Sequence, residues 1–349
     1  MPKIGNFIRT TVLVALAATL AVVAAGTAGA QPAKKAGVTL SGAGSSFVSP
    51  LVAQWVAPLG SAYGYELQYS PIGSGGGIAA ITARTVDFGA SDAPLTSDQF
   101  AACKECVQIP WALSATSVIY NLDGVKNLLH MTGPVLARIF SGQITSWDDP
   151  AIRALNKGVN LPSTKIAVVH RSDNSGTTYN FTDYLSSASP AWKSQYGVGV
   201  AVNWPVGSGQ RGSAGVAAGV SQTPGGIGYV DVAFALKNHL KYFAMRNRSG
   251  KYATPGLKGI LAAATSDQKP TAGTNELSIV NPPKKFPLAY PIATYTYVIV
   301  PTSSPKAADL RKFLFWAVTK GQSFGPKLLF QPIPKSVLVV AEKTIAKIK

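Results

Sequence analysis

The sequence predicts an α/β fold with two lobes, each a mainly parallel sheet flanked by helices. Beyond the N-terminal region, short strand-like runs alternate with helix-like runs, which is the pattern of a parallel sheet with crossover helices. Two long β-rich runs, residues 108–121 and 289–300, are expected to cross between the lobes as hinge strands. Because the chain crosses twice, the first lobe is expected to contain both ends of the chain.

Apolar runs define the elements expected in the first lobe. The strands are residues 38–40, 66–69 and 86–90, and the helices are residues 48–56 and 78–83. Near the C-terminus, apolar residues recur at helical spacing within residues 307–319, at Leu310, Phe313, Leu314 and Ala317. This helix is expected to pack back onto the first lobe.

The elements expected in the second lobe are separated by longer polar stretches. Helices are predicted at residues 133–140, 150–155 and 179–185, and strands at residues 166–169 and 227–230. Residues 203–215 contain Gly and Ser and are expected to form a loop. Residues 250–281 are rich in Gly, Ala, Thr, Ser and Lys, and we expect them to be the least constrained surface segment.

Residues 1–30 have the anatomy of a secretory signal peptide. Lys3 and Arg9 give a positive start, an apolar run covers residues 11–24, and Ala28-Gly29-Ala30 matches a small-residue cleavage site. We therefore expect an exported, periplasmic or extracytoplasmic protein that is cleaved near Ala30. A retained N-terminal anchor is the alternative, because residues 11–30 could just span a bilayer.

Cys103 and Cys106 are the only cysteines of the chain, and in an exported protein such a close pair most simply forms a local disulfide. A redox-active pair is the alternative, but no thioredoxin-like strand and helix surround it. The three histidines stand apart in the sequence, and a zinc site needs more ligands than they offer. We therefore expect no metal and no cofactor.

The chain is strongly basic, with 32 Lys and Arg against 15 Asp and Glu and a formal net charge of +17. Such a charge raises the rate of encounter with anions. The basic residues are scattered, and no basic helix or aromatic-rich motif accompanies them, so nucleic acid is not the expected ligand. The scarcity of acidic residues suggests a protein that works in an acidic exterior, where carboxylates protonate.

The most informative stretch is Val168 to Thr178, where an apolar strand ends in a cation and a loop of small polar residues leads into a helix. The first turn of a helix has unpaired N–H donors and a partial positive charge, which suit an anion. Arg171 adds a planar set of donors that fits a tetrahedral oxyanion. Asp173 must either hold this arginine in place or accept a proton from the ligand.

Two further loops repeat the same design. Residues 41–47 and 71–77 are rich in Gly and Ser, and each leads into a helix-like run. Glycines let the backbone approach a ligand closely, although a glycine turn before a helix is commonly a plain connection. Ligands of open α/β sheets bind beyond the carboxyl ends of the strands, where these three loops are expected to lie. Together the loops predict a shared oxyanion site.

These segments resemble the periplasmic phosphate-binding proteins of high-affinity phosphate ABC transporters, from about Thr39 to the C-terminal region. The motifs that carry the resemblance are Gly42–Phe47, Ile72–Gly77, Val86–Leu95, Ile139–Pro150, the Arg171 segment and Gly225–Val230. The resemblance implies a two-lobed, Venus-flytrap periplasmic-binding-protein fold. With it we expect lobe I to comprise residues 31–118 and 297–349, and lobe II residues 119–296.

The resemblance also implies which residues bind the ligand and which partners the protein has. The expected phosphate contacts are Ser46, Phe47, Ser74, Asp92, Arg171, Ser175, Gly176 and Thr177, with Asp173 pairing with the arginine. Ser46 stands where the family usually has threonine, so the hydroxyl is kept. The implied partners are inorganic phosphate and the membrane permease subunits of a phosphate ABC transporter, and the implied state is a monomer.

Asp92 is expected to select the ligand. A carboxylate only accepts hydrogen bonds, so it can pair with a phosphate that carries a proton but not with sulfate. The contact would be worth about tenfold discrimination or more, because an unmade buried hydrogen bond costs ~1–3 kcal/mol. A helix N-cap or another loop-ordering role is the alternative for this residue.

Three other functions compete with phosphate binding. A secreted phosphatase or serine hydrolase could use Ser46, Ser74 or Ser175, but neither a nucleophile elbow nor a metal-ligand cluster is evident in the sequence. A basic adhesin or polyanion binder would show salt-sensitive binding that ignores Arg171. The ligand could also be another oxyanion, such as arsenate or sulfate.

Overall fold

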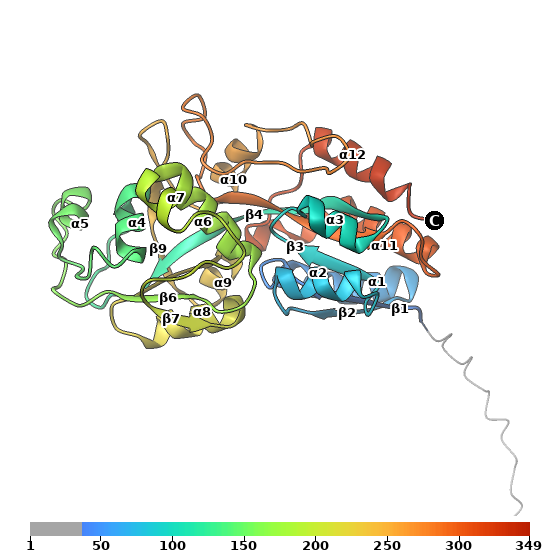
Figure 1. Ribbon diagram of the computed structural model, residues 1–349, viewed down its shortest axis with the longest axis horizontal. Coiled ribbons are helices and arrows are strands. Elements are labelled where there is room, and N and C mark those ends of the chain that lie inside the picture. The colour runs from blue at the N-terminus through green and yellow to red at the C-terminus, as the bar shows by residue number, and fades with distance from the viewer. Residues whose placement is uncertain (1–36) are drawn as a thin grey trace, which may run out of the picture. The chain divides into compact units, whose positions relative to one another are not determined.

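A computed structural model describes residues 37–349 (Figure 1). The predicted signal peptide and its cleavage site near Ala30 lie outside the described residues. From residue 37 onward, no helix has both the length and the apolar character needed to cross a bilayer.

Strands and helices alternate along the chain as predicted. The first half contains β1 (Thr39–Gly44), α1 (Ser49–Tyr63), β2 (Glu66–Ser70), α2 (Ser74–Thr82), β3 (Phe88–Ser91), α3 (Ser97–Cys103), β4 (Cys106–Tyr120), β5 (His130–Met131), α4 (Gly133–Phe140), α5 (Pro150–Leu155), β6 (Ala167–Arg171) and α6 (Gly176–Ala188). The second half contains α7 (Pro190–Gln195), β7 (Ser208–Gln210), α8 (Gly212–Gln222), β8 (Gly226–Asp231), α9 (Val232–Lys237), β9 (Lys241–Tyr242), β10 (Ala244–Arg246), β11 (Tyr252–Ala253), α10 (Leu257–Ala264), β12 (Ala293–Pro301), α11 (Ala307–Val318), the short 3₁₀ helices η1 (Lys320–Phe324) and η2 (Pro326–Leu328), and α12 (Lys335–Ile345).

Nine of these strands form one mixed sheet, in the order β2-β1-β3-β12-β4-β8-β6-β7, with β9 paired to β4. The outer pairs β1–β2, β1–β3, β6–β7 and β6–β8 are parallel. The central pairs β3–β12, β12–β4 and β4–β8 are antiparallel. The expected α/β fold of two lobes is therefore confirmed, and antiparallel strands join the two parallel halves.

Strand β4 connects the two halves of the sheet. Residues 106–115 pair with β12, and residues 116–120 pair with β8. The crossing predicted for residues 108–121 is thus made by β4. Strand β12 lies along the first part of β4 only, and the carbonyl of Ile292 just before it accepts a hydrogen bond from the Thr116 N–H at 2.8 Å.

Two expectations for the second lobe were wrong. Residues 203–215, expected to be a loop, contain β7 and the start of α8. Residues 250–281, expected to be unconstrained, contain α10, whose Ile260 and Ala263 are fully buried. In the same segment the Asn275 amide donates to the carbonyl of Gln108 at 2.8 Å. Small residues give no periodic pattern in residues 203–215, whereas Leu257, Ile260 and Leu261 of α10 recur at helical spacing, a signal that the overall composition of residues 250–281 obscured.

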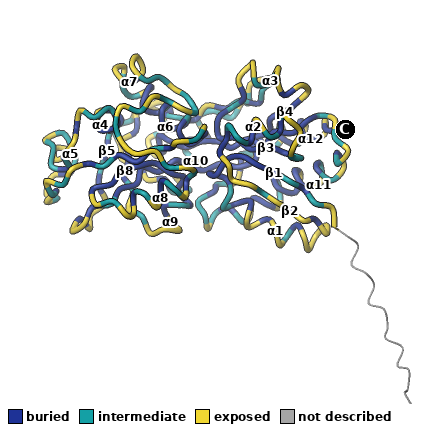
Figure 2. Tube along the Cα trace, turned by 60° about the horizontal axis from the view of Figure 1, so that its bottom comes forward, coloured by how far each residue is buried: buried dark blue, intermediate teal, exposed yellow. Residues whose placement is uncertain are grey.

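An aromatic cluster fixes helix α11 against the first lobe. Trp55 of α1 lies 5.2 Å from Trp111 of β4 between ring centroids, and Phe88 of β3 lies 5.2 Å from Phe313 of α11. These side chains are fully buried, and Figure 2 shows that the buried residues follow the strands while exposed residues lie on the outer turns. Helix α11 therefore packs back onto the N-terminal strands, as expected for residues 307–319, and α12 is a further helix that the sequence analysis did not predict.

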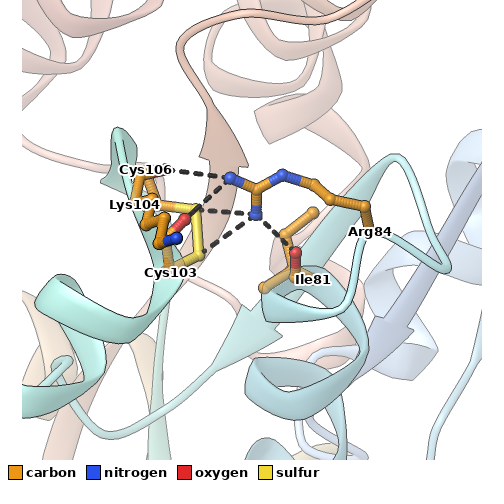
Figure 3. Close-up of a disulfide and its surroundings, with 5 residues drawn as sticks. All are labelled: Ile81, Arg84, Cys103, Lys104 and Cys106. Atoms are coloured by element: carbon orange, nitrogen blue, oxygen red, sulfur yellow. Dashed lines mark hydrogen bonds between the residues drawn. A yellow bond between two sulfur atoms is a disulfide. The ribbon is translucent and has the colours of Figure 1, made fainter.

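Cys103 and Cys106 form the expected local disulfide at the turn between α3 and β4 (Figure 3). Arg84 holds this turn: its Nη1 lies 3.5 and 3.4 Å from the two sulfurs, and its Nη2 donates to the carbonyls of Cys103 and Lys104 at 2.7 and 2.8 Å. Cys106 pairs with Pro301, at the end of β12 that lies farthest from the carboxyl end of β3. The disulfide is therefore at the opposite edge of the sheet from the predicted ligand loops.

Candidate functional site

The three predicted ligand loops follow β1, β2 and β6, the loop that carries Asp92 follows β3, and hydrogen bonds between these loops bring the carboxyl ends of the four strands together. Backbone hydrogen bonds join them, because the Ser45 N–H donates to Ala90 at 2.9 Å and the Gly73 N–H donates to Gly44 at 2.8 Å. Gly77 is needed for this approach, since a Cβ there would lie 2.4 Å from the Cα of Gly44. The small residues of the motifs therefore let the loops pack directly against one another.

The loop before α1 contributes Ser46 and Phe47. The Ser46 hydroxyl lies 3.0 Å from the hydroxyl of Ser213 and accepts a hydrogen bond from the Ser213 N–H at 3.1 Å. Ser213 lies at the start of α8, a helix that packs on β8 and β6 in the second lobe. The Phe47 N–H donates to the Ser45 hydroxyl at 3.0 Å, while its ring is buried against Phe330. Ser46 thus joins two segments that lie far apart in the sequence.

Ser74, at the first position of α2, contacts both the loop that carries Asp92 and the start of α6. Its hydroxyl accepts hydrogen bonds from the N–H groups of Asp92 and Gly176, at 3.2 and 3.1 Å. Next to it, the Gly75 N–H donates to the carbonyl of Asn174 at 3.0 Å. Ser74 therefore ties the loop before α3 to the start of α6.

Helix α6 begins with the residues that the sequence singled out. Ser175 is its N-cap and accepts a hydrogen bond from the Thr178 N–H at 3.2 Å, so one acceptor of its hydroxyl serves the helix. A Cβ on Gly176 would lie 2.6 Å from the Ser74 hydroxyl and 2.7 Å from Asp92, which explains the glycine. The Thr177 hydroxyl lies 3.5 Å from Nη1 of Arg171, at the limit of a hydrogen bond.

Arg171 and Asp173 form a bidentate ion pair. Nε and Nη2 of the arginine lie 2.7 and 2.5 Å from the two carboxylate oxygens, and the two side chains are 2% and 14% exposed. Asp173 also accepts a hydrogen bond from the Gly212 N–H at 3.1 Å. Burial alone would raise the pKa of Asp173, but the hydrogen bonds and the charge of Arg171 lower it below its ordinary value. Asp173 therefore remains ionised and orients the guanidinium, as expected.

Asp92 is the second carboxylate of the site, and it is buried, with only 2% of its surface exposed. Its Oδ1 accepts hydrogen bonds from the hydroxyls of Ser45 at 2.5 Å and Thr296 at 3.0 Å. Burial raises the pKa of Asp92 to about 6, while these two hydroxyls and the charge of Arg171 oppose the rise. The N-cap of α3 is Thr96, so the alternative role of Asp92 as a helix cap does not hold.

The structure adds three residues that the sequence analysis missed: Ser45, Ser213 and Thr296. Ser45 lies in the motif Gly42–Phe47, but nothing in the sequence separates its role from that of Ser46. Ser213 lies in the segment expected to be a loop, and Thr296 is an ordinary threonine in a β-rich run. Strand pairing and helix packing place all three next to the predicted residues, and these contacts have no local sequence signal.

The assembled groups are suited to a protonated oxyanion. The starts of α1, α2 and α6 supply N–H groups and hydroxyls, and Arg171 supplies a positive charge. Asp92 offers an acceptor in a buried setting, where a matching hydrogen bond is strong and an unmatched one is costly. Within residues 37–349, no group of three or more His, Cys, Asp or Glu side chains could hold a metal ion.

Comparison with known proteins agrees with the class of protein that this fold and site define. A family model described as the PBP superfamily domain matches residues 25–320. The phosphate-binding protein PstS of Xylella fastidiosa (strain Temecula1) is 41% identical over 305 residues, which cover 86% of this chain and 83% of that protein. The phosphate-binding protein PstS of Pasteurella multocida (strain Pm70) is 37% identical over 305 residues, covering 86% of this chain and 88% of that protein.

Solved structures share the fold. A high-affinity periplasmic phosphate-binding protein, PfluDING, determined with bound phosphate, superposes with a TM-score of 0.73 at 20% identity and covers 88% of this chain and 93% of its own. A phosphate-binding protein from Stenotrophomonas maltophilia superposes with a TM-score of 0.69 at 21% identity over the same shares. The chain therefore belongs to the PBP superfamily and, within it, to the family of PstS phosphate-binding proteins.

Proposed function

We propose that this protein binds inorganic phosphate outside the cytoplasm and delivers it to the permease subunits of an ABC-type phosphate importer. The observation that carries the proposal is the meeting of three helix starts, the Arg171–Asp173 pair and the buried Asp92 at one place. The phosphate contacts are Ser46, Phe47, Ser74, Asp92, Arg171, Ser175, Gly176 and Thr177. The relatives with more than a third of their residues identical carry the name of phosphate-binding proteins.

The two lobes are proposed to close on the ligand by hinge motion. Lobe I comprises residues 31–118 and 297–349, and lobe II residues 119–296. The change of partner along β4, from β12 to β8 after residue 115, supports a boundary close to residue 118. Hinge closure around a ligand is a general device of two-lobed binding proteins.

The protein is proposed to act as a monomeric binding protein with no catalytic activity of its own. It would be exported by a signal peptide cleaved near Ala30, and nucleic acid is not among its proposed partners. The buried serines support this view, because Ser46, Ser74 and Ser175 bond to other serines or to backbone N–H groups. A nucleophile would need a general base within hydrogen-bond reach instead.

Isothermal titration of residues 31–349 with phosphate, with sulfate as competitor, tests the function. We expect tight phosphate binding that an excess of sulfate does not displace. The absence of heat and of a thermal shift with phosphate would refute the assignment. Turnover of a chromogenic phosphoester that Ser175→Ala abolishes would instead favour an enzyme.

A further inference from the structure

Ser45 is a buried serine whose hydroxyl has a fixed hydrogen-bond direction. Its Oγ accepts from the N–H groups of Phe47 and Val48, at 3.0 and 3.4 Å, and lies 2.5 Å from Oδ1 of Asp92. A hydroxyl has one proton and two acceptor lone pairs. Because both lone pairs face amide donors, the proton of Ser45 must point to Asp92.

Thr296 of β12 places a second hydroxyl on the same carboxylate oxygen, at 3.0 Å, and its side chain is fully buried. Oδ1 of Asp92 therefore receives two O–H donors, which occupy its lone pairs. In the described part of the chain, no hydrogen bond reaches Oδ2. The two oxygens of this carboxylate are thus unequal, and Oδ2 is the one left to accept a ligand proton.

The link through Ser45 also connects Asp92 to helix α1. The N–H groups of Phe47 and Val48 belong to the start of that helix, where the backbone carries a partial positive charge. Hydrogen bonds in a chain polarise one another, so these amides strengthen the donation from Ser45 to the carboxylate. The start of α1 thereby stabilises the ionised form of Asp92 without touching it.

Few positive charges lie near Asp92 that could also stabilise its ionised form. Arg171 of β6 favours the ionised form of Asp92, whereas Asp231, at the start of α9, is an acid that interacts with it unfavourably. Asp183 of α6 and Glu276 line a cavity of about 30 Å³ together with Asp92, as do Tyr179 and Tyr297. Burial, together with the charge of Asp92, raises the pKa of Tyr69 of β2. Because most of these neighbours are acidic or neutral, the two hydroxyls are the direct partners that keep Asp92 an acceptor.

We propose that Ser45 and Thr296 are positioning residues for ligand discrimination: their hydroxyls hold Oδ1 of Asp92 so that Oδ2 meets the proton of the bound oxyanion. This inference rests on the proposed phosphate-binding function and explains how one carboxylate separates a protonated phosphate from sulfate. Without the hydroxyls, Asp92 would take up a proton at a higher pH and would then donate to either anion.

Ser45→Ala and Thr296→Val test the inference in two measurements. In the ligand-free proteins, NMR titration of the Asp92 carboxyl, assigned with Asp92→Asn, should show the midpoint moving upward by about one pH unit in each variant. In competition titrations at pH 6.5, the preference for phosphate over sulfate should fall about threefold, as the protonated fraction of Asp92 rises. Thr296→Ser keeps the hydroxyl, so its Asp92 midpoint and its preference for phosphate over sulfate should equal those of the wild type.

Ser114→Ala is the matched control, because Ser114 is a fully buried serine of β4 whose hydroxyl donates to the carbonyl of Leu329 at 2.9 Å and not to Asp92. It should leave the Asp92 midpoint and the preference unchanged. If Ser45→Ala does not fold, Thr296→Val carries the test, since it removes no helix contact. An unmoved Asp92 midpoint in the folded variants would overturn the inference. Failure of the wild type to bind phosphate would refute the function instead, because the titration of Asp92 needs no ligand.

Discussion

The site contains two aspartates whose surroundings shift their pKa values in opposite directions, the buried Asp92 and the partly buried Asp173. Asp173 faces Arg171 through two charged hydrogen bonds, and its pKa is lowered. Asp92 faces two neutral hydroxyls, and burial raises its pKa to about 6. Both are aspartates near a loop rich in small residues, so the difference comes from their partners and not from their own chemistry.

This difference assigns the two acids to different tasks. An acid with its own cation is already neutralised as a pair, so Asp173 can orient Arg171 without repelling an anion. An acid with only neutral donors keeps its charge at a cost, and the cost is recovered when a ligand brings a proton to it. The comparison therefore predicts that changes on the Arg171 side weaken all anion binding, whereas changes on the Asp92 side alter selectivity.

Removal of the cation should have the largest effect. Arg171→Ala removes the positive charge of the site and leaves the partly buried Asp173 unpaired beside the place where an anion binds, and truncating one partner of a hydrogen-bonded charge pair costs about 2–5 kcal/mol of binding free energy. We expect phosphate affinity to fall by about 1,000-fold by isothermal titration. The matched control is Arg153→Ala, because Arg153 is 59% exposed in its pair with Asp148 and such surface pairs contribute little. Near-normal affinity in Arg171→Ala would contradict the proposed site.

The two acids should also act in opposite directions on stability as the pH changes. The pKa of Asp92 is higher in the folded protein than its ordinary value of 3.8, so the folded state binds the extra proton between about pH 4 and 6. The ligand-free protein should therefore gain up to about 3 kcal/mol from this group as the pH falls through 6 towards 4. Asp173 has a lowered pKa, so its contribution is present above the unfolded pKa and is lost only as the pH falls further.

Thermal denaturation of the ligand-free protein between pH 7.5 and 4 measures this difference. The melting temperature should rise from pH 7 to pH 5, and Asp92→Asn should reduce the rise. A melting temperature that falls steadily over the same range would show that Asp92 is ionised without cost. A high melting temperature near pH 4 would also agree with the hypothesis of an acidic working environment.

Neutralising each acid in turn should separate selectivity from affinity. Asp92→Asn supplies an amide that can donate to sulfate, so the preference for phosphate over sulfate should fall about tenfold or more. Asp173→Asn leaves Arg171 less well oriented, so both anions should bind more weakly by about the same factor. Competition titrations of the two variants side by side measure this. Equal changes in selectivity would remove the distinction between the two acids.

The smallest effect on binding is expected at the disulfide, which lies at the opposite edge of the sheet. The double variant Cys103→Ser/Cys106→Ser should lose some stability, because Arg84 and the disulfide fix the turn before β4. Such a short closed loop contributes modestly, and we expect the phosphate affinity to change less than about twofold. A large loss of affinity in a protein that still melts cooperatively would show that this turn communicates with the ligand loops.

Local patterns predicted most of the elements, because apolar spacing is set by the face that each element buries. The helix at 150–155 matches the prediction fully, and the strand and helix around Arg171 and Ser175 lie where the motif placed them. The prediction failed for β7 and the start of α8, where small residues give no period, and for α10, whose short apolar spacing lies in a segment otherwise rich in Gly, Ala, Thr, Ser and Lys. These elements exist because neighbours from distant parts of the chain cover them.

The sequence by itself determined the chemistry of this protein: the small-residue loops, Arg171, Asp173 and Asp92 are all evident in the order of the amino acids, since side-chain type and local spacing decide them. Only the tertiary structure decided which groups meet. It placed Thr296 and Ser45 on one oxygen of Asp92, Ser213 on Ser46, and Ser74 between Asp92 and Gly176. These contacts join residues up to 204 positions apart. Their geometry follows from strand register and helix packing, which depend on the whole chain and not on any single segment.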